Sequence, residues 1–225
     1  MASNTYRAIR AKQTPSTITV YQAYSPEIAE PALKAQKFVP PFSRERMTWI
    51  KPSFLWMAYR SGWAKKPRQE RVLAIEITRE GFEWALRHSC LSHYMPGEET
   101  SQEEWRKKLR ASPVRVQWDP ERDISMRSLS YRSIQIGLSG EAVGRYVDEW
   151  IVSVTDVTAT MRLMDGYLET GDVQAAKGCL PEETPFVLPE DLQEGWAKWV
   201  GQDVYGIEET ETGIARASIT EVQSN

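Results

Sequence analysis

Alternation of apolar and polar positions is clearest in two segments of the sequence, residues 17–24 and 71–78. In the first, Ile18, Val20 and Gln22 fall on one face, and Thr19 and Tyr21 fall on the other. Both segments are rich in β-branched and aromatic residues, which favour strands. The pattern therefore predicts two strands here, and weaker versions of it predict strands over 113–118, 132–138 and 149–154.

Capping signals between these strands predict helices. Ser25, Pro26 and Glu27 supply an N-cap, a proline at the first helical position and an acidic first turn, so a helix is expected to about residue 36. Similar signals predict helices over 78–88, 102–110, 139–146 and 156–170, and a docking helix over 192–200. The Asp-Pro sequence within residues 119–123 is typical of a turn.

Three of the nine tryptophans lie in one stretch, residues 49–63. Pro52 suits the first turn of a helix and disfavours helical geometry at Lys51. We therefore expect an extended segment over 49–51, then a helix that begins near Pro52 and ends at Gly62. Trp56 and Arg60 would share one face of this helix because they are four residues apart.

Strand and helix patterns alternate without the regularity of βαβ units, which favours an α+β fold. We expect a single mixed domain over residues 1–200, with a split or strongly twisted, antiparallel-rich sheet and flanking helices. Residues 201–225 are polar and acidic, and we expect them to form a disordered tail.

Charge is distributed unevenly along the chain, although the net charge is only −3. Residues 1–132 carry 23 Lys and Arg against 14 Asp and Glu, whereas residues 133–225 carry 5 against 17. A basic body could attract an anionic ligand, a nucleotide or RNA, although the acidic part could equally serve to neutralise it. The basic run at 106–110 is either a solvated helix face or a phosphate-binding patch.

The sequence offers little evidence of a secreted, membrane or metal-dependent protein. It contains no apolar run of transmembrane length and no secretory signal. Cys90 and Cys179 fit neither a metal site nor a disulfide framework, which favours the cytoplasm. His88 and His93 lack a cluster of partners, and the phosphate-binding, zinc-protease and nucleophile-elbow motifs are absent, so no metal is expected.

The remaining candidate site combines aromatic, cationic and amide side chains. Cations bind phosphates through charge-assisted hydrogen bonds, and aromatic faces stack on bases or a nicotinamide ring. The alternative is that the aromatic residues are core and the cations are paired surface groups. The candidates are Arg10, Tyr21, Gln22, Lys51, Ser53, Trp56, Arg60, Ser61, Arg132 and Gln135.

Several long motifs resemble a family designated domain of unknown function 4291. They are VYQAY at 20–24, RMTWIKPSFLWM at 46–57, YRSGW at 59–63, QWDPERD at 117–123 and RSIQIG at 132–137. The resemblance extends over about residues 5–200 and supports a single domain, and it implies no particular activity.

The order of elements also resembles that of the ADP-ribosyltransferase superfamily. That resemblance implies NAD in a cleft between two small sheets, with an Arg or His on the first strand and a Glu late in the chain. This chain has Gln22 and Gln135 at the corresponding places. The RNA 2′-phosphotransferase branch relies on basic residues instead, a part that Arg10, Lys51, Arg60 and Arg132 would play here.

We therefore expect an enzyme of ADP-ribosyltransferase-like type that binds NAD or a nucleic-acid phosphate. Gln135, Arg132 and Arg60 are its candidate catalytic residues. The candidate cofactor-binding residues are Arg10, Tyr21, Gln22, Lys51, Ser53, Trp56 and Ser61. The alternatives are a non-catalytic module that binds RNA or an acidic partner, and an enzyme acting on a small anionic metabolite.

Overall fold

The strands form three sheets in the computed structural model, which describes residues 6–95 and 101–200. One sheet has the antiparallel order β2-β4-β8, with bounds Thr17–Tyr24, Arg71–Thr78 and Ile151–Asp156. A second has the order β3-β7-β6-β5, with bounds Thr48–Ile50, Ser128–Leu138, Val114–Arg122 and Ser89–Leu91. In the second sheet β5 and β6 are parallel and the other pairs are antiparallel. The short strands β1 (Arg10–Ala11) and β9 (Thr184–Pro185) form the third.

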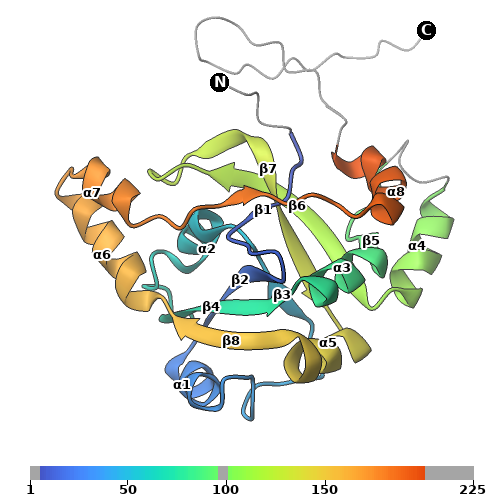
Figure 1. Cartoon of the computed structure of the whole chain (residues 1–225), viewed down its shortest axis with the longest axis horizontal. Helices are drawn as coiled ribbons and strands as arrows, with labels where there is room; N and C mark the ends of the chain where they lie inside the picture. The colour runs from blue at the N-terminus through green and yellow to red at the C-terminus, as the bar shows by residue number, and fades with distance from the viewer. Residues whose placement is uncertain (1–5, 96–100, 201–225) are drawn as a thin grey trace, which may run out of the picture.

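Helices flank these sheets and lie at both ends of the molecule. Figure 1 shows α6 and α7 at one end and α4 and α8 at the opposite end, with α1 beyond β8. The helices are α1 (Pro26–Ala35), α2 (Phe54–Ser61), α3 (Arg79–Arg87), α4 (Gln102–Ala111), α5 (Glu141–Arg145), α6 (Thr158–Glu169), α7 (Val173–Gly178) and α8 (Glu190–Val200). A π-helical turn, η1 (Tyr146–Trp150), follows α5. This is the single α+β domain with antiparallel-rich sheets that the sequence predicts.

The two segments with clear alternation form adjacent strands of the first sheet, the edge strand β2 and the central strand β4. β2 and β4 pair along their whole length, from Thr17 opposite Thr78 to Tyr24 opposite Arg71. Ile18 of β2 is completely buried. Each such side chain contributes about 1.5–3 kcal/mol through burial. The predicted α1 is also present, with Ser25 at its N-cap and Pro26 as its first residue.

Two local predictions were wrong. The predicted turn at 119–123 is the end of β6, which continues through Pro120 to Arg122 with a register shift between these two residues. Proline is tolerated in a strand at such an irregularity because a regular ladder is already interrupted there. The strand predicted from Glu149 begins only at Ile151, because the preceding residues form the π-helical turn.

The first two sheets meet at Tyr21 and Lys51. The Tyr21 amide donates to the Lys51 carbonyl at 2.7 Å, and the Lys51 amide donates to the Tyr21 carbonyl at 3.3 Å. The larger of two apolar cores fills the space around β2, β4, β6 and β7, and the smaller lies under α2, α6 and α7. The segment that joins the sheets therefore lies between both cores.

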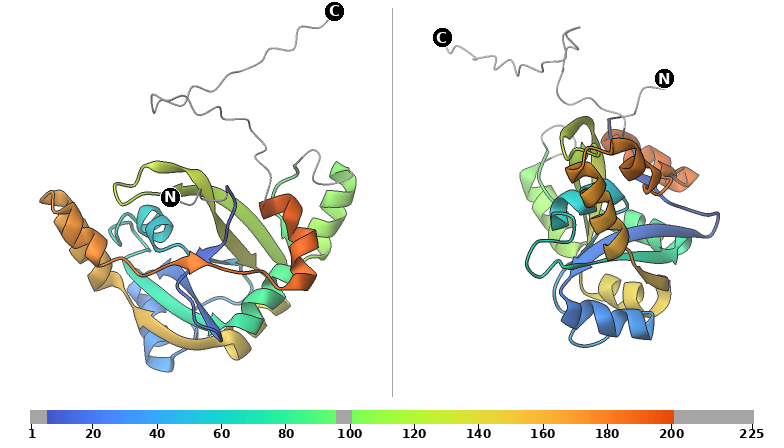
Figure 2. Two further views of the ribbon diagram at one scale, coloured as in Figure 1. Left: turned by 45° about the horizontal axis from the view of Figure 1, so that its top comes forward. Right: turned by 90° about the vertical axis from the view of Figure 1, so that its left-hand side faces the viewer.

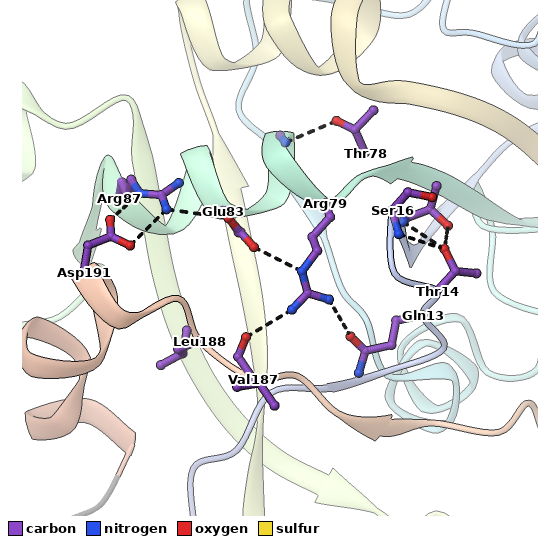
Figure 3. A network of polar contacts seen from close by, with 12 residues as sticks. Gln13, Thr14, Ser16, Thr78, Arg79, Glu83, Arg87, Val187, Leu188 and Asp191 are labelled. Carbon is purple, nitrogen blue, oxygen red and sulfur yellow. Dashed lines mark hydrogen bonds and ion pairs between the residues drawn. The ribbon is translucent and has the colours of Figure 1, made fainter.

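The chain after α7 crosses back over the domain as a strap, which we define as residues 183–192. The strap includes β9 and runs from α7 to α8 across the front of the molecule (Figure 1 and Figure 2). Arg79 and Arg87 of α3 hold it through Val187 and Asp191 (Figure 3). The predicted docking helix is present as α8, whereas the predicted acidic tail, residues 201–225, lies outside the described residues.

Candidate functional site

A cavity of about 990 Å³ lies where the two larger sheets and α2 come together. Its volume is at the upper end of the range of about 300–1,000 Å³ that is common for small-molecule sites. The walls come from β2, β3, β6, β7, α2 and the loops before β3 and β4. The lining residues that matter most for its chemistry are Gln22, Arg46, Trp49, Lys51, Trp56, Arg60, Arg68, Gln117, Asp119 and Gln135.

Helix α2 forms one wall of the cavity, and its ends follow from local sequence. The side chain of Ser53 accepts a hydrogen bond of 3.1 Å from the Trp56 amide and so caps the first turn. Gly62 ends the helix in the left-handed conformation, with φ of 57°, which glycine adopts without steric cost. The helix thus begins at Phe54, two residues after the proline from which the sequence predicts it.

Lys51 lies at the floor of the cavity, and only 1% of its side chain is exposed. Its Nζ donates to Asp119 Oδ2 at 2.9 Å and lies 3.5 Å from the centroid of the Trp56 ring. Burial lowers the pKa of Lys51 to about 8, although the neighbouring Asp119 carboxylate opposes this shift. Lys51 therefore enters the site from the end of β3, within the segment that the sequence predicts to be extended.

Asp119 is the carboxylate of this site, held by one donor from each side. Oδ2 accepts from Lys51, and Oδ1 accepts from Gln117 Nε2 at 2.9 Å. Gln117 in turn stands directly opposite Gln135 across the β6–β7 ladder. Within the described part of the chain the Gln135 side chain makes no hydrogen bond, so its amide is available to a ligand.

Gln22 lines the cavity, but its amide is already engaged. Nε2 donates to Thr48 Oγ1 at 2.7 Å and also lies within bonding distance of Tyr24 and the Trp49 carbonyl. Oε1 accepts from the Tyr146 hydroxyl at 2.7 Å. Burial raises the pKa of Tyr24 to about 12 and that of Tyr146 well above its usual value, so both hydroxyls stay protonated. Gln22 therefore holds β2 to β3 rather than presenting free groups.

Three arginines stand around the mouth of the cavity. Arg46, Arg60 and Arg68 all line it and are all exposed. Arg60 Nη1 donates to the Gln69 side chain at 3.3 Å. The mouth is thus basic, whereas the floor carries the Lys51–Asp119 ion pair and three amides.

Five of the predicted residues lie outside the cavity. Ser61 is buried and donates to the Met57 carbonyl at 2.9 Å, so it stabilises the end of α2. Tyr21 is buried edge-on against Phe54, with its pKa raised by burial. The remaining three are Arg10, Ser53 and Arg132.

Arg132 and Gln135 do not share a site, although the sequence prediction grouped them as catalytic. They are three residues apart on β7, so their side chains project from opposite faces of the strand. Arg132 Nε donates to the Tyr6 hydroxyl at 3.0 Å on the far face. Arg10, which also lies outside the cavity, stacks on Tyr131, with its guanidinium carbon 4.6 Å from the ring centroid.

Ser53 belongs to a second polar cluster at the N-terminus of α2. Its hydroxyl donates to Glu121 Oε1 at 2.9 Å, and Glu183 Oε1 of the strap accepts from the Phe54 amide at 2.7 Å. Burial, assisted by the nearby Glu121, raises the pKa of Glu183 to about 8. This cluster fixes the strap to α2 and does not line the cavity.

Sequence reasoning missed Asp119, Gln117 and Trp49. The first two were assigned to different elements, because the Asp-Pro sequence suggested a turn after Trp118. The available signal was the alternation of Gln117, Asp119 and Glu121, which places three polar side chains on one face of a continuing strand.

The fold and the site together define an α+β protein with a large polar cavity between two antiparallel-rich sheets. The chain belongs to the family described as Domain of unknown function (DUF4291), whose model matches residues 8–186. No curated protein and no solved structure matches the chain. The family resemblance in the sequence is thereby confirmed, and the likeness to ADP-ribosyltransferases gains no support from these comparisons.

Over residues 6–95 and 101–200, no three His, Cys, Asp or Glu side chains gather as they would around a metal ion. None of the helices in those ranges combines the length and the apolar character needed to cross a bilayer.

Proposed function

We propose that the protein is a transferase that binds NAD or another phosphorylated nucleotide in the cavity. The observation that carries the proposal is the arrangement of side chains in the cavity, with arginines at its mouth and a carboxylate and amides at its floor. Arg46, Arg60 and Arg68 surround the mouth, where they would bind phosphates through charge-assisted hydrogen bonds. Asp119 and Gln135 lie deeper, where the reacting part of a nucleotide would be held.

Asp119 is the residue suited to the chemical step. Its two donors fix the orientation of the carboxylate, and 17% of its side chain remains exposed to the cavity. A fixed carboxylate stabilises positive charge that develops on a sugar ring in glycosidic cleavage. The same carboxylate can accept a proton from an attacking group within hydrogen-bond reach.

With NAD as the substrate, ADP-ribose would be transferred from nicotinamide to an acceptor hydroxyl. The bond between the ribose C1′ and the nicotinamide nitrogen breaks, and its electron pair leaves on the nicotinamide. An acceptor hydroxyl oxygen bonds to C1′, and its proton passes to Asp119. In this proposal Lys51 positions Asp119, and Gln135 orients the substrate through its amide.

The test measures binding first and product second. Calorimetry with NAD, ADP-ribose and a 5′-phosphorylated oligoribonucleotide should show binding that Arg68→Ala weakens. Arg106→Ala, on the exposed face of α4, is the matched control and should bind as the original protein does. Chromatography should then detect nicotinamide released from NAD, and Asp119→Asn should abolish release while binding persists. Absence of binding by all three ligands at millimolar concentration would contradict the proposal.

A non-catalytic RNA-binding module is the second candidate function. The observation that favours it is the exposure of all three arginines, which leaves them accessible to a polyanion larger than the cavity. On this alternative, oligoribonucleotide binding weakens steeply with salt, with a slope that falls by about 0.7 when Arg60→Ala removes one phosphate contact. No product would form from any nucleotide. An enzyme of small anionic metabolites would instead bind neither NAD nor RNA.

A further inference from the structure

Trp49 lies directly over a strand position that has no side chain. Trp49 on β3 pairs with Gly137 on β7. A Cβ atom at residue 137 would lie 2.9 Å from Trp49 Cη2 and 3.0 Å from Cζ2. The glycine therefore leaves the space in which the indole ring lies against the sheet. Trp49 also lines the cavity and is only partly buried.

The two tryptophans of the cavity differ in what their rings already contact. The Trp56 ring is 9% exposed and has the Lys51 ammonium over its face. The Trp49 ring has no aromatic or cationic partner among the residues that the structure describes. The ring available to stack on a ligand is thus that of Trp49, rather than that of Trp56, which the sequence predicted.

Gln135 lies beside this ring on the same face of the sheet. It precedes Gly137 by two residues on β7, so both positions face the cavity side on which Trp49 lies. Its amide has one acceptor and two donor hydrogens, and no described residue occupies them. A glutamine amide can pair with the amino group and ring nitrogen of an adenine edge.

We propose that Trp49 and Gln135 form a binding subsite for a planar nitrogen heterocycle of the adenine or nicotinamide kind. The ring stacks on the indole, and its amino or carboxamide edge hydrogen-bonds to the Gln135 amide. This inference deepens the proposed function and rests on it, because the subsite would hold the base of the nucleotide whose phosphates the arginines bind. A neutral nucleoside, however, would occupy the subsite without the arginines.

The first experiment separates stacking from phosphate binding. Calorimetry is run with adenosine, AMP and ribose 5-phosphate on the original protein and on Trp49→Leu, Trp49→Phe and the control Trp105→Leu on α4. Trp49→Leu should weaken adenosine and AMP by about tenfold or more and leave ribose 5-phosphate unchanged. Trp49→Phe, which keeps a ring, should lose less, and the control should lose nothing. Equal adenosine binding by Trp49→Leu and the original protein would overturn the inference.

The second experiment tests the amide and remains informative if Trp49→Leu does not fold. Gln135→Leu should weaken adenosine by about tenfold and should weaken purine riboside, which lacks the amino group but keeps the ring nitrogen, by a smaller factor. Equal losses for both nucleosides, or none, would overturn the pairing. Failure of the proposed function looks different: adenosine binds, yet AMP binds no tighter than adenosine and Arg68→Ala changes nothing. If adenosine and purine riboside both fail to bind at millimolar concentration, the subsite itself is refuted.

Discussion

Lys51 and Asp119 form an ion pair of 2.9 Å between Nζ and Oδ2, which ties the end of β3 to β6 at the floor of the cavity. The two partners are buried unequally, because 1% of the Lys51 side chain is exposed against 17% of that of Asp119. Removing Asp119 is therefore the more damaging change, since it leaves the deeper charge without a partner.

We predict that Asp119→Asn lowers the free energy of unfolding by about 3 kcal/mol at about pH 7. Loss of the carboxylate removes the main influence that raises the pKa of Lys51, so that pKa falls further below about 8. When the folded pKa of a lysine lies below its unfolded pKa, the protein becomes more stable as the pH rises from the folded to the unfolded value. The deficit of Asp119→Asn should therefore shrink by about pH 9.5, as urea denaturation at the two pH values can show.

Asp148→Asn is the matched control for that prediction. Asp148 pairs with Arg44 on the surface, and about half of each side chain is exposed, 48% in both cases. Surface pairs of this kind contribute about 0–1 kcal/mol. A loss in Asp119→Asn no larger than in Asp148→Asn, with the same pH dependence, would contradict the account of a buried pair.

Glu183 gives a second and opposite dependence on pH. Its folded pKa of about 8 lies above the usual 4.5, because burial penalises the charged carboxylate. A carboxyl with a raised folded pKa contributes stability below its unfolded pKa, and that contribution is lost as pH rises through the folded pKa. We predict that the midpoint temperature of thermal unfolding decreases as the pH is raised from about 4.5 to about 8. The substitution Glu183→Gln should make this decrease smaller.

The control for Glu183 is its neighbour. Glu182 is exposed, so Glu182→Gln should keep the slope of the original protein. Glu183→Gln retains an oxygen that can accept the Phe54 amide hydrogen, so the α2 contact itself can persist. An unchanged slope in Glu183→Gln would show that this carboxyl is not the group that titrates.

Gly81 and Gly166 should respond in opposite directions to the same substitution. Both are helical, where alanine is normally favoured over glycine by about 1 kcal/mol. A Cβ at residue 81, however, would lie 2.3 Å from the ring of the buried Trp150, whereas no atom of the described residues lies within 4 Å of a Cβ at residue 166. We predict that Gly81→Ala destabilises by about 1–3 kcal/mol and that Gly166→Ala stabilises slightly. Denaturant midpoints that shift the same way in both variants would contradict this.

Local signals were sufficient to predict most elements of the fold. Ser25 and Pro26 start α1, Gly62 ends α2, and the alternation in 17–24 and 71–78 marks β2 and β4. Each of these features depends on residues close together in the chain. The partition into two sheets joined at Tyr21 and Lys51 depends on pairing between distant segments, for which the sequence carries no local signal.

The candidate site was predicted less well because residues were grouped by chemistry rather than by strand geometry. Gln22, Lys51, Trp56, Arg60 and Gln135 do line one cavity. Arg10 and Arg132 were assigned to the same site only because arginine side chains can bind phosphates. The two-residue period of a strand would have placed Arg132 on the opposite face of β7 from Gln135. The pairing of Lys51 with Asp119 could be identified only from the fold.

The strap offers a last prediction, since Arg79 holds it with several groups at once. Its Nη2 donates to the Val187 carbonyl at 3.1 Å, and its guanidinium carbon lies 4.3 Å from the Phe186 ring centroid (Figure 3 shows the polar contacts). Hydrogen bonds from charged groups contribute about 1.5–3 kcal/mol each. Arg79→Met keeps most of the apolar stem and removes the bond to Val187, together with the bonds to Gln13 and Glu83.

We predict that Arg79→Met raises the rate of hydrogen exchange at the Phe186 amide by about tenfold or more. That amide donates to the carbonyl of Ile9, the residue before β1, at 2.8 Å, so it exchanges when the strap leaves this segment. Arg162→Met is the control, because Arg162 lies on α6 and donates to the Glu70 carbonyl away from the strap. If exchange at Phe186 rises equally in both variants, or in neither, the Arg79 contacts do not hold the strap. A rise confined to Arg79→Met, with β4 amides still protected, would show that the strap opens as a local unit while the sheets stay folded.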